Sequence, residues 1–493
     1  MPYAITQLCC TDASCVAACP VNCIHPTPDE PDFGTTDMLY VDPRTCIDCG
    51  ACAEACPVDA VLPVETLTGA LADYPAINAE YFAGTEPAAP AAGSPLFHDW
   101  GPVRFDRVLP ADFPRLDVAV VGSGPAGMYT VQDLLLHTTA RVTLYDRLPV
   151  TGGLVNFGVA PDHADTKRIG ESFSRYLGHH RLRLRLDTEV GQDVGVDELA
   201  ARHDAVIYAV GAPTARALGV PGEELAGHLP STTVVGWYNG HPEIDADAVP
   251  LDTERVAVVG TGNVALDIAR ILAADPSTLS GSAIAPGALE RLRVSRVREV
   301  VLLGRRGPEH AAYTRGELHA LRRRDDLEVI VDDHDPRVAA AIDAAAPGEH
   351  AALLQGVPRS SDVPAGDGRR RVVLRFHAPT EALLGDDRVT AVRAGGADLP
   401  AGLVVRAIGH RGRPTDGLPF DEATGTIPHH AGRVDGRPGT YVVGWIKRGP
   451  GGGIGVNRRD AAETVASLIE DGKDHVIGAR PRRANLLRRL TSM

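Results

Sequence analysis

Two stretches of the chain repeat one hydrophobic pattern. Each opens with a short apolar run, LDVAVVG at residues 116–122 and RVAVVG at residues 255–260. Each run leads into a glycine-rich loop, GSGPAG or GTGNVA, and then into a helix-like stretch, MYTVQDLLLH or LDIARILAA. A strand, a glycine loop and a helix in this order predict a parallel sheet that binds a nucleotide at its C-terminal edge. The chain therefore contains two predicted nucleotide-binding units.

The first loop has the residues that a dinucleotide requires. Gly122 permits the tight turn, Gly124 lets the backbone approach a pyrophosphate, and Gly127 lets the helix pack on the strand. The helix N-terminus faces the negative charge of the ligand. The next strand, RVTLYDR, ends in Asp146, where a carboxylate would bind a ribose hydroxyl. This context favours a bound dinucleotide over a purely structural turn.

The second loop repeats the glycine pattern, but the strand that follows it ends in residues of a different charge. Gly260, Gly262 and Ala265 take the three loop positions. The following strand, REVVLLGRRGP, ends in Arg305 and Arg306 instead of an acid. Paired guanidinium groups suit a 2′-phosphate, so the pattern predicts NADP and not NAD. The alternative is that the two arginines only solvate a strand edge.

All nine cysteines lie in the first 56 residues. Four of them form the run C-x2-C-x2-C-x3-C-P, which binds iron–sulfur clusters in bacterial-type ferredoxins, and a second Cys-Pro pair occurs at Cys19. In two-cluster ferredoxins the cysteine before proline ligates the other cluster, which predicts crossed ligation here. One [4Fe–4S] cluster is assigned to Cys46, Cys49, Cys52 and Cys19, and a second cluster to Cys56, Cys15 and Cys9.

The first cysteine motif lacks the usual middle spacing, so we expect its cluster to be [3Fe–4S]. This feature resembles the seven-iron ferredoxins. Cys10 could replace Cys9 as third ligand, and a second [4Fe–4S] cluster would form if both bind. Cys23 is expected to be a buried thiol beside a cluster. Zinc is disfavoured, because zinc sites usually have two separated C-x2-C pairs.

Length and charge bound the remaining possibilities. The 493 residues suggest about three domains. The absence of a long apolar run and of a signal peptide, together with crowded thiols, predicts a cytoplasmic protein without membrane partners. Residues 1–82 have a net charge of −11, against −4 for the rest. This acidity makes nucleic acid an unfavourable partner and suits docking on a basic face, although it could simply serve solubility.

From Leu116 to about Asp471 the chain resembles the adrenodoxin reductase family of flavoprotein NADPH–ferredoxin reductases. The motifs that carry the resemblance are VVGSGPAGMYT, GGLVNFGVAPDH, PGEEL, VGWYNG, VVGTGNVALDIARIL, GRRGP and YVVGWIKRGPGGGIGVN. With the cysteine segment included, the whole chain resembles the fused ferredoxin/ferredoxin–NADP reductases of actinobacteria.

The resemblance implies an α/β fold class: two Rossmann-like domains of the glutathione/adrenodoxin reductase type, preceded by a small α+β ferredoxin domain. The expected boundaries are 1–82 for the ferredoxin-like domain, 83–114 for an Ala/Pro-rich linker, 115–214 and 400–493 for the FAD-binding domain with a basic C-terminal tail, and 215–399 for the NADP-binding domain.

The resemblance also implies which residues bind the cofactors FAD and NADP(H). The residues expected at FAD are Gly122, Gly124, Pro125, Ala126, Gly127, Asp146, Arg147, Gly153, Leu154, Trp445, Gly452 and Ile454. Those expected at NADP are Gly260, Gly262, Asn263, Val264, Ala265, Arg305, Arg306 and Glu317. His163, from APDH, is expected to be catalytic together with Glu317. The plainer alternatives are a helix-bracing role for His163, an exposed helix acid at Glu317 and core packing for Trp445.

The function implied is hydride transfer from NADPH to FAD, followed by single-electron transfer to the iron–sulfur clusters and to an external ferredoxin or cytochrome P450. A redox-active disulfide of the thioredoxin-reductase kind is excluded, because no cysteine follows residue 56. Three alternatives stay open: an electron-input subunit resembling the small subunit of glutamate synthase, a non-catalytic redox sensor, and an N-terminal module outside the electron path. The pattern does not identify the final acceptor, the electron direction or the oligomeric state, for which a monomer is plausible.

Overall fold

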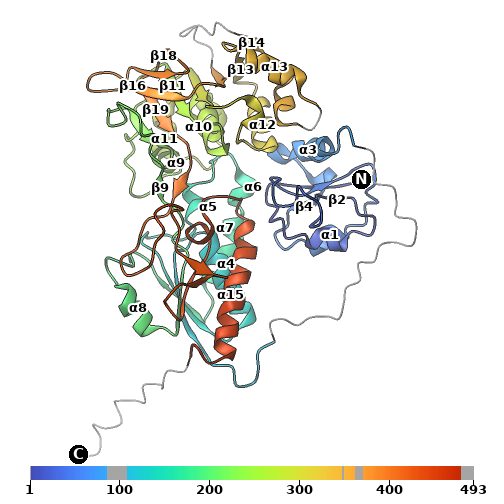
Figure 1. Ribbon diagram of the computed structural model, residues 1–493, viewed down its shortest axis with the longest axis vertical. Helices are drawn as coiled ribbons and strands as arrows, with labels where there is room; N and C mark the ends of the chain where they lie inside the picture. Colours follow the sequence, from blue (N-terminus) through green and yellow to red (C-terminus); the bar gives the residue numbers. More distant parts are fainter. Residues whose placement is uncertain (1, 86–107, 347–348, 361–369, 479–493) are drawn as a thin grey trace, which may run out of the picture. The chain divides into compact units, whose positions relative to one another are not determined.

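The computed structural model describes residues 2–85, 108–346, 349–360 and 370–478 (Figure 1). Most of the expected linker (86–107) and the basic tail (479–493) lie outside the described residues. The chain divides into two compact units. One comprises Met1–Gly101, Leu154–Arg168 and Ala215–His410, and the other comprises Pro102–Gly153, Ile169–Thr214 and Arg411–Met493. Strands β9 (Thr214–Ala215) and β20 (His410–Arg411) lie where the chain passes from one unit to the other.

The N-terminal segment of the first unit is a small α+β fold, called the head below. Strand β1 pairs antiparallel with β4, and β2 pairs antiparallel with β3. Asn78 is buried among them, since its Oδ1 accepts from the backbone N–H of Ile5 and Val41 and its Nδ2 donates to Ile5 O. The elements are β1 (Tyr3–Ile5), α1 (Ser14–Ala18), β2 (Ile24–His25), β3 (Tyr40–Val41), α2 (Ala51–Ala55), β4 (Val61–Pro63), η1 (Val64–Thr66), η2 (Gly69–Asp73) and α3 (Tyr74–Tyr81).

The rest of the first unit is built on a seven-stranded parallel sheet in the order β10-β19-β11-β12-β15-β13-β14. Its central strands are buried, as the continuous apolar runs predict for a parallel sheet covered on both faces. The strands are β10 (His228–Pro230), β11 (Arg255–Val259), β12 (Glu299–Leu303), β13 (Glu328–Asp332), β14 (Arg359–Ser360), β15 (Arg371–Arg375) and β19 (Leu403–Arg406).

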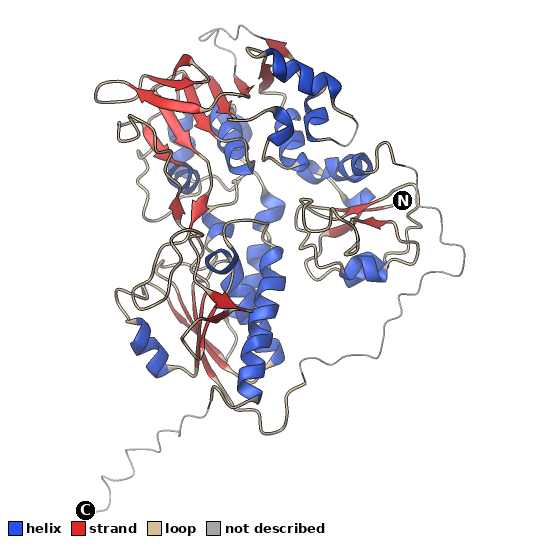
Figure 2. Ribbon diagram, viewed as in Figure 1, coloured by secondary structure: helices blue, strands red, loops and turns tan. Residues whose placement is uncertain are grey.

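Short helices and a second, antiparallel sheet complete this unit (Figure 2). The sheet has the order β16-β17-β18, with β16 (Thr380–Leu384), β17 (Ala391–Ala394) and β18 (Ala397–Pro400). The helices are α5 (Leu154–Phe157), α6 (Ala164–Lys167), α9 (Ser231–Tyr238), α10 (Asn263–Ala273), η3 (Pro276–Leu279), α11 (Pro286–Arg293), η4 (Pro308–His310), α12 (Arg315–Arg322), α13 (Pro336–Ala344) and η5 (His350–Leu354).

The second unit has its own seven-stranded sheet, in the order β21-β22-β23-β8-β5-β6-β7, of which the run β23 to β7 is parallel. Its strands are β5 (Asp117–Val121), β6 (Arg141–Tyr145), β7 (Leu182–Arg185), β8 (Ala205–Tyr208), β21 (His429–His430), β22 (Arg433–Val434) and β23 (Thr440–Val442). Its helices are α4 (Pro125–His137), α7 (Ile169–Leu177), α8 (Val196–Arg202), α14 (Trp445–Arg448) and α15 (Val456–Lys473), and α15 packs on α4.

These two sheets confirm the predicted fold class, with one strand–glycine loop–helix unit at the centre of each. Strand β5 leads into α4, and strand β11 leads into α10. The described part of residues 340–371 contains the end of α13, η5, β14 and the start of β15. Within the described ranges, every helix is too short or too polar to cross a membrane.

Candidate functional site

The first glycine loop has the backbone that the sequence predicts. Gly122, directly after β5, has φ +103°, and a Cβ there would overlap the carbonyl oxygen of Ala209. A Cβ at Gly127, in the first turn of α4, would overlap the carbonyl oxygen of Gly122. Around Gly124, by contrast, a Cβ would have no protein atom within 4 Å. The loop is closed toward the sheet and open at the N-terminus of α4, where a pyrophosphate fits.

Asp146 follows β6 at the same edge, and neighbouring residues donate hydrogen bonds to its carboxylate. Its Oδ2 accepts from Ser123 N at 2.8 Å and Ser123 Oγ at 2.5 Å, and its Oδ1 accepts from Leu148 N at 2.9 Å. A carboxylate has about four lone-pair sites, so room for a ribose hydroxyl is left. Arg147 beside it is exposed.

Two glycine-containing segments pack against this loop within the second unit. Gly153 has φ +49°, and a Cβ there would lie 2.8 Å from Gly124 Cα. A Cβ at Gly444, which precedes α14, would lie 2.6 Å from the Cβ of Ala126. The segment that begins with Trp445 is therefore brought to the first turn of α4, which Pro125 opens.

For the other residues expected at FAD, the structure gives their exposure and one hydrogen bond. Trp445 is half-buried, and its Nε1 donates to Gly451 O at 3.2 Å. Gly452 is exposed with φ +74°, and Ile454 is half-buried. Leu154 opens α5 in the first unit and is 46% exposed.

The second glycine loop repeats the geometry of the first. Gly260 has φ +128°, and a Cβ there would overlap the carbonyl oxygen of Ala407. Around Gly262 the nearest atoms to a Cβ lie at 3.9 Å. Ala265 is fully buried in α10, and Val264 before it is half-buried. The loop is thus open at the N-terminus of α10, where a phosphate would be stabilised.

Asn263 connects this loop to α12. Its Oδ1 accepts from Thr314 N at 2.7 Å, and its Nδ2 donates to Thr314 Oγ1 at 3.2 Å. Thr314 is the residue before the first turn of α12. The start of α10 and the start of α12 are therefore held together by one side chain.

Arg305 and Arg306 follow β12 and are exposed, as binding to a phosphate requires. Arg305 lines an open cavity of about 540 Å³ together with His334, Arg337 and His377. His377 N donates to Arg306 O at 3.0 Å, so the end of β15 is tied to the arginine pair. Asp335, which pairs with Arg337, also lines this cavity, which lies at the carboxyl edge of the sheet.

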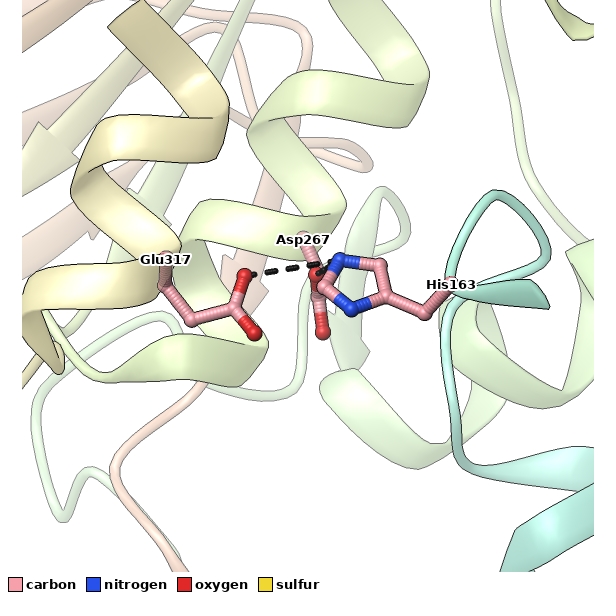
Figure 3. Close-up of side chains that lie close together, drawn as sticks. All are labelled: His163, Asp267 and Glu317. Carbon is pink, nitrogen blue, oxygen red and sulfur yellow. Dashed lines mark ion pairs between the residues drawn. The ribbon is translucent and has the colours of Figure 1, made fainter. Parts of the chain in front are cut away.

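The two residues expected to be catalytic lie side by side (Figure 3). His163 Nε2 is 3.5 Å from Glu317 Oε2 and 3.5 Å from Asp267 Oδ1. Glu317 is 7% exposed, which excludes the alternative of an exposed helix acid. The side chain of His163 makes no hydrogen bond to the start of α6, so it does not act as a helix cap.

Three residues of this cluster were missed in the sequence: Asp162, Asp267 and Arg270. Arg270 is 3% exposed and donates to the carboxylates of Asp162 and Asp267. A signal was present, because LDIARILAA has an acid and an arginine three residues apart in an otherwise apolar helix. Side chains at this spacing share one helix face.

The cluster also changes the protonation of its members. Burial, followed by the nearby Asp267 carboxylate, raises the pKa of Glu317 to about 7. The side-chain atoms of His163, Asp267 and Glu317 lie within 4.8 Å of one another, as metal ligands do. The guanidinium of Arg270 already supplies positive charge at this point, so we assign no metal to it.

The thiols of the two expected ligand groups lie close to one another in the head. One group is Cys9, Cys15 and Cys56, and the other is Cys19, Cys46, Cys49 and Cys52. None of the nine forms a disulfide. Burial raises the pKa of Cys15, and the thiols of Cys9 and Cys56 raise it further. Burial and then the thiols of Cys19, Cys46 and Cys49 raise the pKa of Cys52 to about 12. Cys52 also raises the pKa of Cys15, so the thiols of the two groups are neighbours of one another as well.

Two further cysteines lie beside these groups. Cys23 Sγ is 3.4 Å from Cys19 Sγ, and hydrogen bonds from Cys23 lower the pKa of Cys19 and of Cys46 to about 6. Burial and Asp12 raise the pKa of Cys10 to about 12. Cys23 therefore lies beside Cys19 and Cys46, as a buried neighbour of two expected ligands.

The acidic head contacts a basic edge of α12 inside the first unit. Glu80 lies 3.2 Å from Arg315 and 3.5 Å from His319, and Asp73 lies 2.6 Å from Arg323. The same helix carries Glu317 on its buried side. The negative charge of the head thus meets basic residues of its own chain.

Two family models match the chain: a 4Fe–4S dicluster domain over residues 8–60 and a pyridine nucleotide-disulphide oxidoreductase model over residues 116–280. A probable ferredoxin/ferredoxin–NADP reductase of Mycobacterium tuberculosis is 44% identical over 96% of this chain and 84% of its own length. The human mitochondrial NADPH:adrenodoxin oxidoreductase is 39% identical over 74% of this chain and 80% of its own length. The structure of Mycobacterium tuberculosis FprA in complex with NADPH matches with a TM-score of 0.66 and 39% identity, over 74% of this chain and 87% of that one.

The dicluster match covers the two cysteine groups, and the oxidoreductase match begins before the first glycine loop and extends beyond the second. The similarity to the mycobacterial relative spans both. The chain belongs to the family of fused ferredoxin/ferredoxin–NADP reductases.

Proposed function

We propose that this protein is an NADPH–ferredoxin oxidoreductase that passes electrons from NADPH to the iron–sulfur clusters of its own head and on to an external ferredoxin. The observation that carries the proposal is that one chain contains two open dinucleotide loops and two groups of thiols. The names of the relatives, which include an NADPH–ferredoxin reductase with a solved NADPH complex, support it. We place the protein in the cytoplasm.

The first glycine loop is proposed to bind FAD and the second to bind NADP(H). Gly124 and Gly262 leave the two helix N-termini open to a pyrophosphate. Asp146 holds the ribose side of the first site, and Arg305 with Arg306 binds the 2′-phosphate at the second. When bound, FAD accepts a hydride from NADPH and releases its electrons one at a time, as the clusters require.

The remaining work falls to side chains of the chain itself. His163 and Glu317 orient the nicotinamide and exclude water from it, which is the main contribution that a protein makes to hydride transfer. Because the pKa of Glu317 is about 7, this residue can hold a proton in the neutral range. No protein nucleophile is required.

We assign a [4Fe–4S] cluster to Cys19, Cys46, Cys49 and Cys52, and a [3Fe–4S] cluster to Cys9, Cys15 and Cys56. The proximity of these thiols supports iron–sulfur ligation, and the two Cys-Pro pairs support the crossed assignment. The contact of Glu80 and Asp73 with α12 supports a head that docks on the nucleotide-binding part of the chain, within the electron path and not as a separate interaction module.

The experiment compares two acceptors. Wild type and Cys52→Ala are supplied with NADPH and either ferricyanide, which oxidises flavins directly, or a bacterial ferredoxin. Wild type should reduce both acceptors, and Cys52→Ala should reduce ferricyanide at an unchanged rate and ferredoxin far more slowly. The absence of turnover with either acceptor would overturn the proposal and favour a redox sensor. Equal ferredoxin reduction by both proteins would place the head outside the electron path.

A further inference from the structure

Arg270 is a buried arginine that faces groups from two other segments of the first unit. It lies on α10 and is 3% exposed. One terminal nitrogen donates to Asp162 Oδ2. The other donates to Asp267 Oδ1 and lies 2.6 Å from His163 Nε2, with Glu317 Oε2 at 4.0 Å. One side chain therefore connects the segment before α6, α10 and α12.

The chemistry of the guanidinium decides the state of His163. An arginine has five N–H donors and no acceptor, and it does not lose its charge in proteins. Although burial alone would lower the pKa of Arg270, the carboxylates of Asp162, Asp267 and Glu317 raise it above its ordinary value. Its terminal nitrogen can contact His163 Nε2 only if that ring nitrogen accepts a hydrogen bond. His163 in this arrangement is neutral, with its proton on Nδ1.

The carboxylates act in the opposite direction. His163 Nε2 is also 3.5 Å from Asp267 Oδ1 and from Glu317 Oε2, and both oxygens would accept a proton held on that nitrogen. Arg270 therefore competes with two carboxylates for one ring nitrogen. If Arg270 is removed, the carboxylates favour a protonated Nε2.

We propose that Arg270 is a positioning residue of the hydride-transfer site, which fixes the ring orientation and tautomer of His163 and holds Glu317 beside it. The proposal rests on the function proposed above for His163 and Glu317. Arg270 touches neither nucleotide in this account and acts only through these two residues. The contact also explains why a cation is buried in a helix whose other residues, apart from Asn263 and Asp267, are apolar.

Other charged and titratable groups face the cluster from the neighbouring elements. Tyr238 of α9 is fully buried, and the carboxylate of Asp267 contributes to raising its pKa. Arg324, after α12, lies 4.0 Å from Asp162, and the charge of Asp162 also acts on Lys167 of α6. These groups are the same in every variant below, so differences between variants report on the residue changed.

The first measurement is the ¹⁵N NMR spectrum of histidine-labelled holoprotein, with His163→Gln to identify the signals of His163. Wild type at pH 8 should show a protonated Nδ1 and an unprotonated Nε2. Arg270→Gln should show Nε2 protonated at the same pH, and Arg270→Lys should restore the wild-type pattern in part. This readout does not depend on turnover.

The second measurement is the pH dependence of flavin reduction by NADPH under single-turnover conditions. Arg270→Gln should shift the midpoint of this pH profile upward by about one pH unit. Loss of a positive charge raises the pKa of a neighbouring carboxyl group. Asp267→Asn should shift it downward, because loss of a negative charge lowers that pKa. A merely structural role predicts no such opposite pair of shifts.

A matched control comes from another buried ion pair of the same sheet. Arg371 Nε lies 2.9 Å from Glu299 Oε2 at the amino end of β15 and β12, away from the nucleotide edge. Arg371→Gln should lower the melting temperature about as much as Arg270→Gln and leave both the His163 signals and the pH midpoint unchanged.

Two results would overturn the proposal: a protonated Nε2 in wild type at pH 8, or identical His163 signals in wild type and in folded Arg270→Gln. If Arg270→Gln does not fold, the downward shift in Asp267→Asn and a partly protonated Nε2 in Arg270→Lys must still appear, and the absence of both would also overturn it. Failure of the proposed function is seen separately, as wild-type rates of flavin reduction in both His163→Gln and Glu317→Gln.

Discussion

The two glycine loops share one backbone conformation, but the residues that follow the next strand have opposite charges. Gly122 and Gly260 both have φ above +100°, and both would overlap a carbonyl oxygen of the neighbouring strand connection if they carried a Cβ. The carboxylate of Asp146 lies beside the first loop and accepts hydrogen bonds from Ser123 and Leu148. Behind the second stand Arg305 and Arg306, both exposed.

This difference in charge is where we expect nucleotide specificity to reside. The turn and the helix N-terminus are shared, so we expect them to fix the position of a pyrophosphate in either unit. The residue after the second strand differs, and we expect it to determine which ribose is accepted. The first turns of the two helices differ as well. Gly127 in α4 lies against Gly122, while the corresponding position in α10 is a buried alanine, Ala265.

The largest effect is expected at this helix position. Gly127→Ala places a Cβ onto the carbonyl oxygen of Gly122, so we expect loss of bound FAD and of folding in the second unit. Flavin absorbance of the purified protein and circular dichroism measure both. The counterpart Ala265→Gly should retain FAD and cost only about 1 kcal/mol of helix stability. Full FAD content in Gly127→Ala would mean that the two loops do not differ in helix packing.

The second prediction concerns nucleotide choice. Replacing Arg305 and Arg306 together by glutamine should raise the KM for NADPH about 100-fold, because charge-assisted hydrogen bonds contribute about 1.5–3 kcal/mol each. The KM for NADH should not change, and steady-state kinetics with both nucleotides measures the ratio. Arg393→Gln, on an exposed strand where Arg393 pairs with Asp398, is the control. An equal loss for NADH would show that the pair does not recognise the 2′-phosphate.

The third prediction tests the acid of the first unit. Asp146→Asn should weaken FAD binding about tenfold, or about 1.4 kcal/mol, because the amide cannot accept all the hydrogen bonds that the carboxylate accepts. Titration of the apoprotein with FAD measures this affinity. Asp204→Asn is matched in chemistry, since Asp204 accepts from the backbone N–H of Asp117 at the opposite end of β5. A tenfold loss in both variants would indicate a general effect on the sheet.

The smallest effect is expected at Asn263, which has no counterpart in the first loop. Asn263→Ala removes the hydrogen bonds to Thr314, and it should cost about 1 kcal/mol of stability, as loss of a helix cap does. Asn263→Asp keeps the acceptor, so it should melt like wild type and still bind NADPH more weakly through charge repulsion. Thermal melting and the KM for NADPH separate the two roles. Equal melting of the alanine variant and wild type would remove the structural role.

Much of the site could be predicted from sequence where one short segment determines the geometry. The strained turns at Gly122 and Gly260 follow from a strand that must reverse into a helix within a few residues. The crossed grouping of Cys19 with Cys46, and of Cys56 with Cys15, is a prediction from two Cys-Pro pairs. His163 and Glu317 came from the family resemblance, and the structure brings them together.

What could not be predicted depends on segments far apart in the chain. Asp162 and Arg270 meet only after α10 packs beside the segment that precedes α6, and no local pattern encodes that contact. The sequence indicated that an acidic head would suit a basic face. That this face is α12, through Arg315 and Arg323, depends on tertiary packing.

The central claim is that NADPH, the flavin and the clusters form one electron path within this chain. Anaerobic addition of NADPH to the purified holoprotein, with flavin absorbance and cluster EPR followed together, tests it directly. The account predicts that the flavin bleaches and that the cluster signals then change within the turnover time. Bleaching of the flavin with unchanged cluster signals would contradict it.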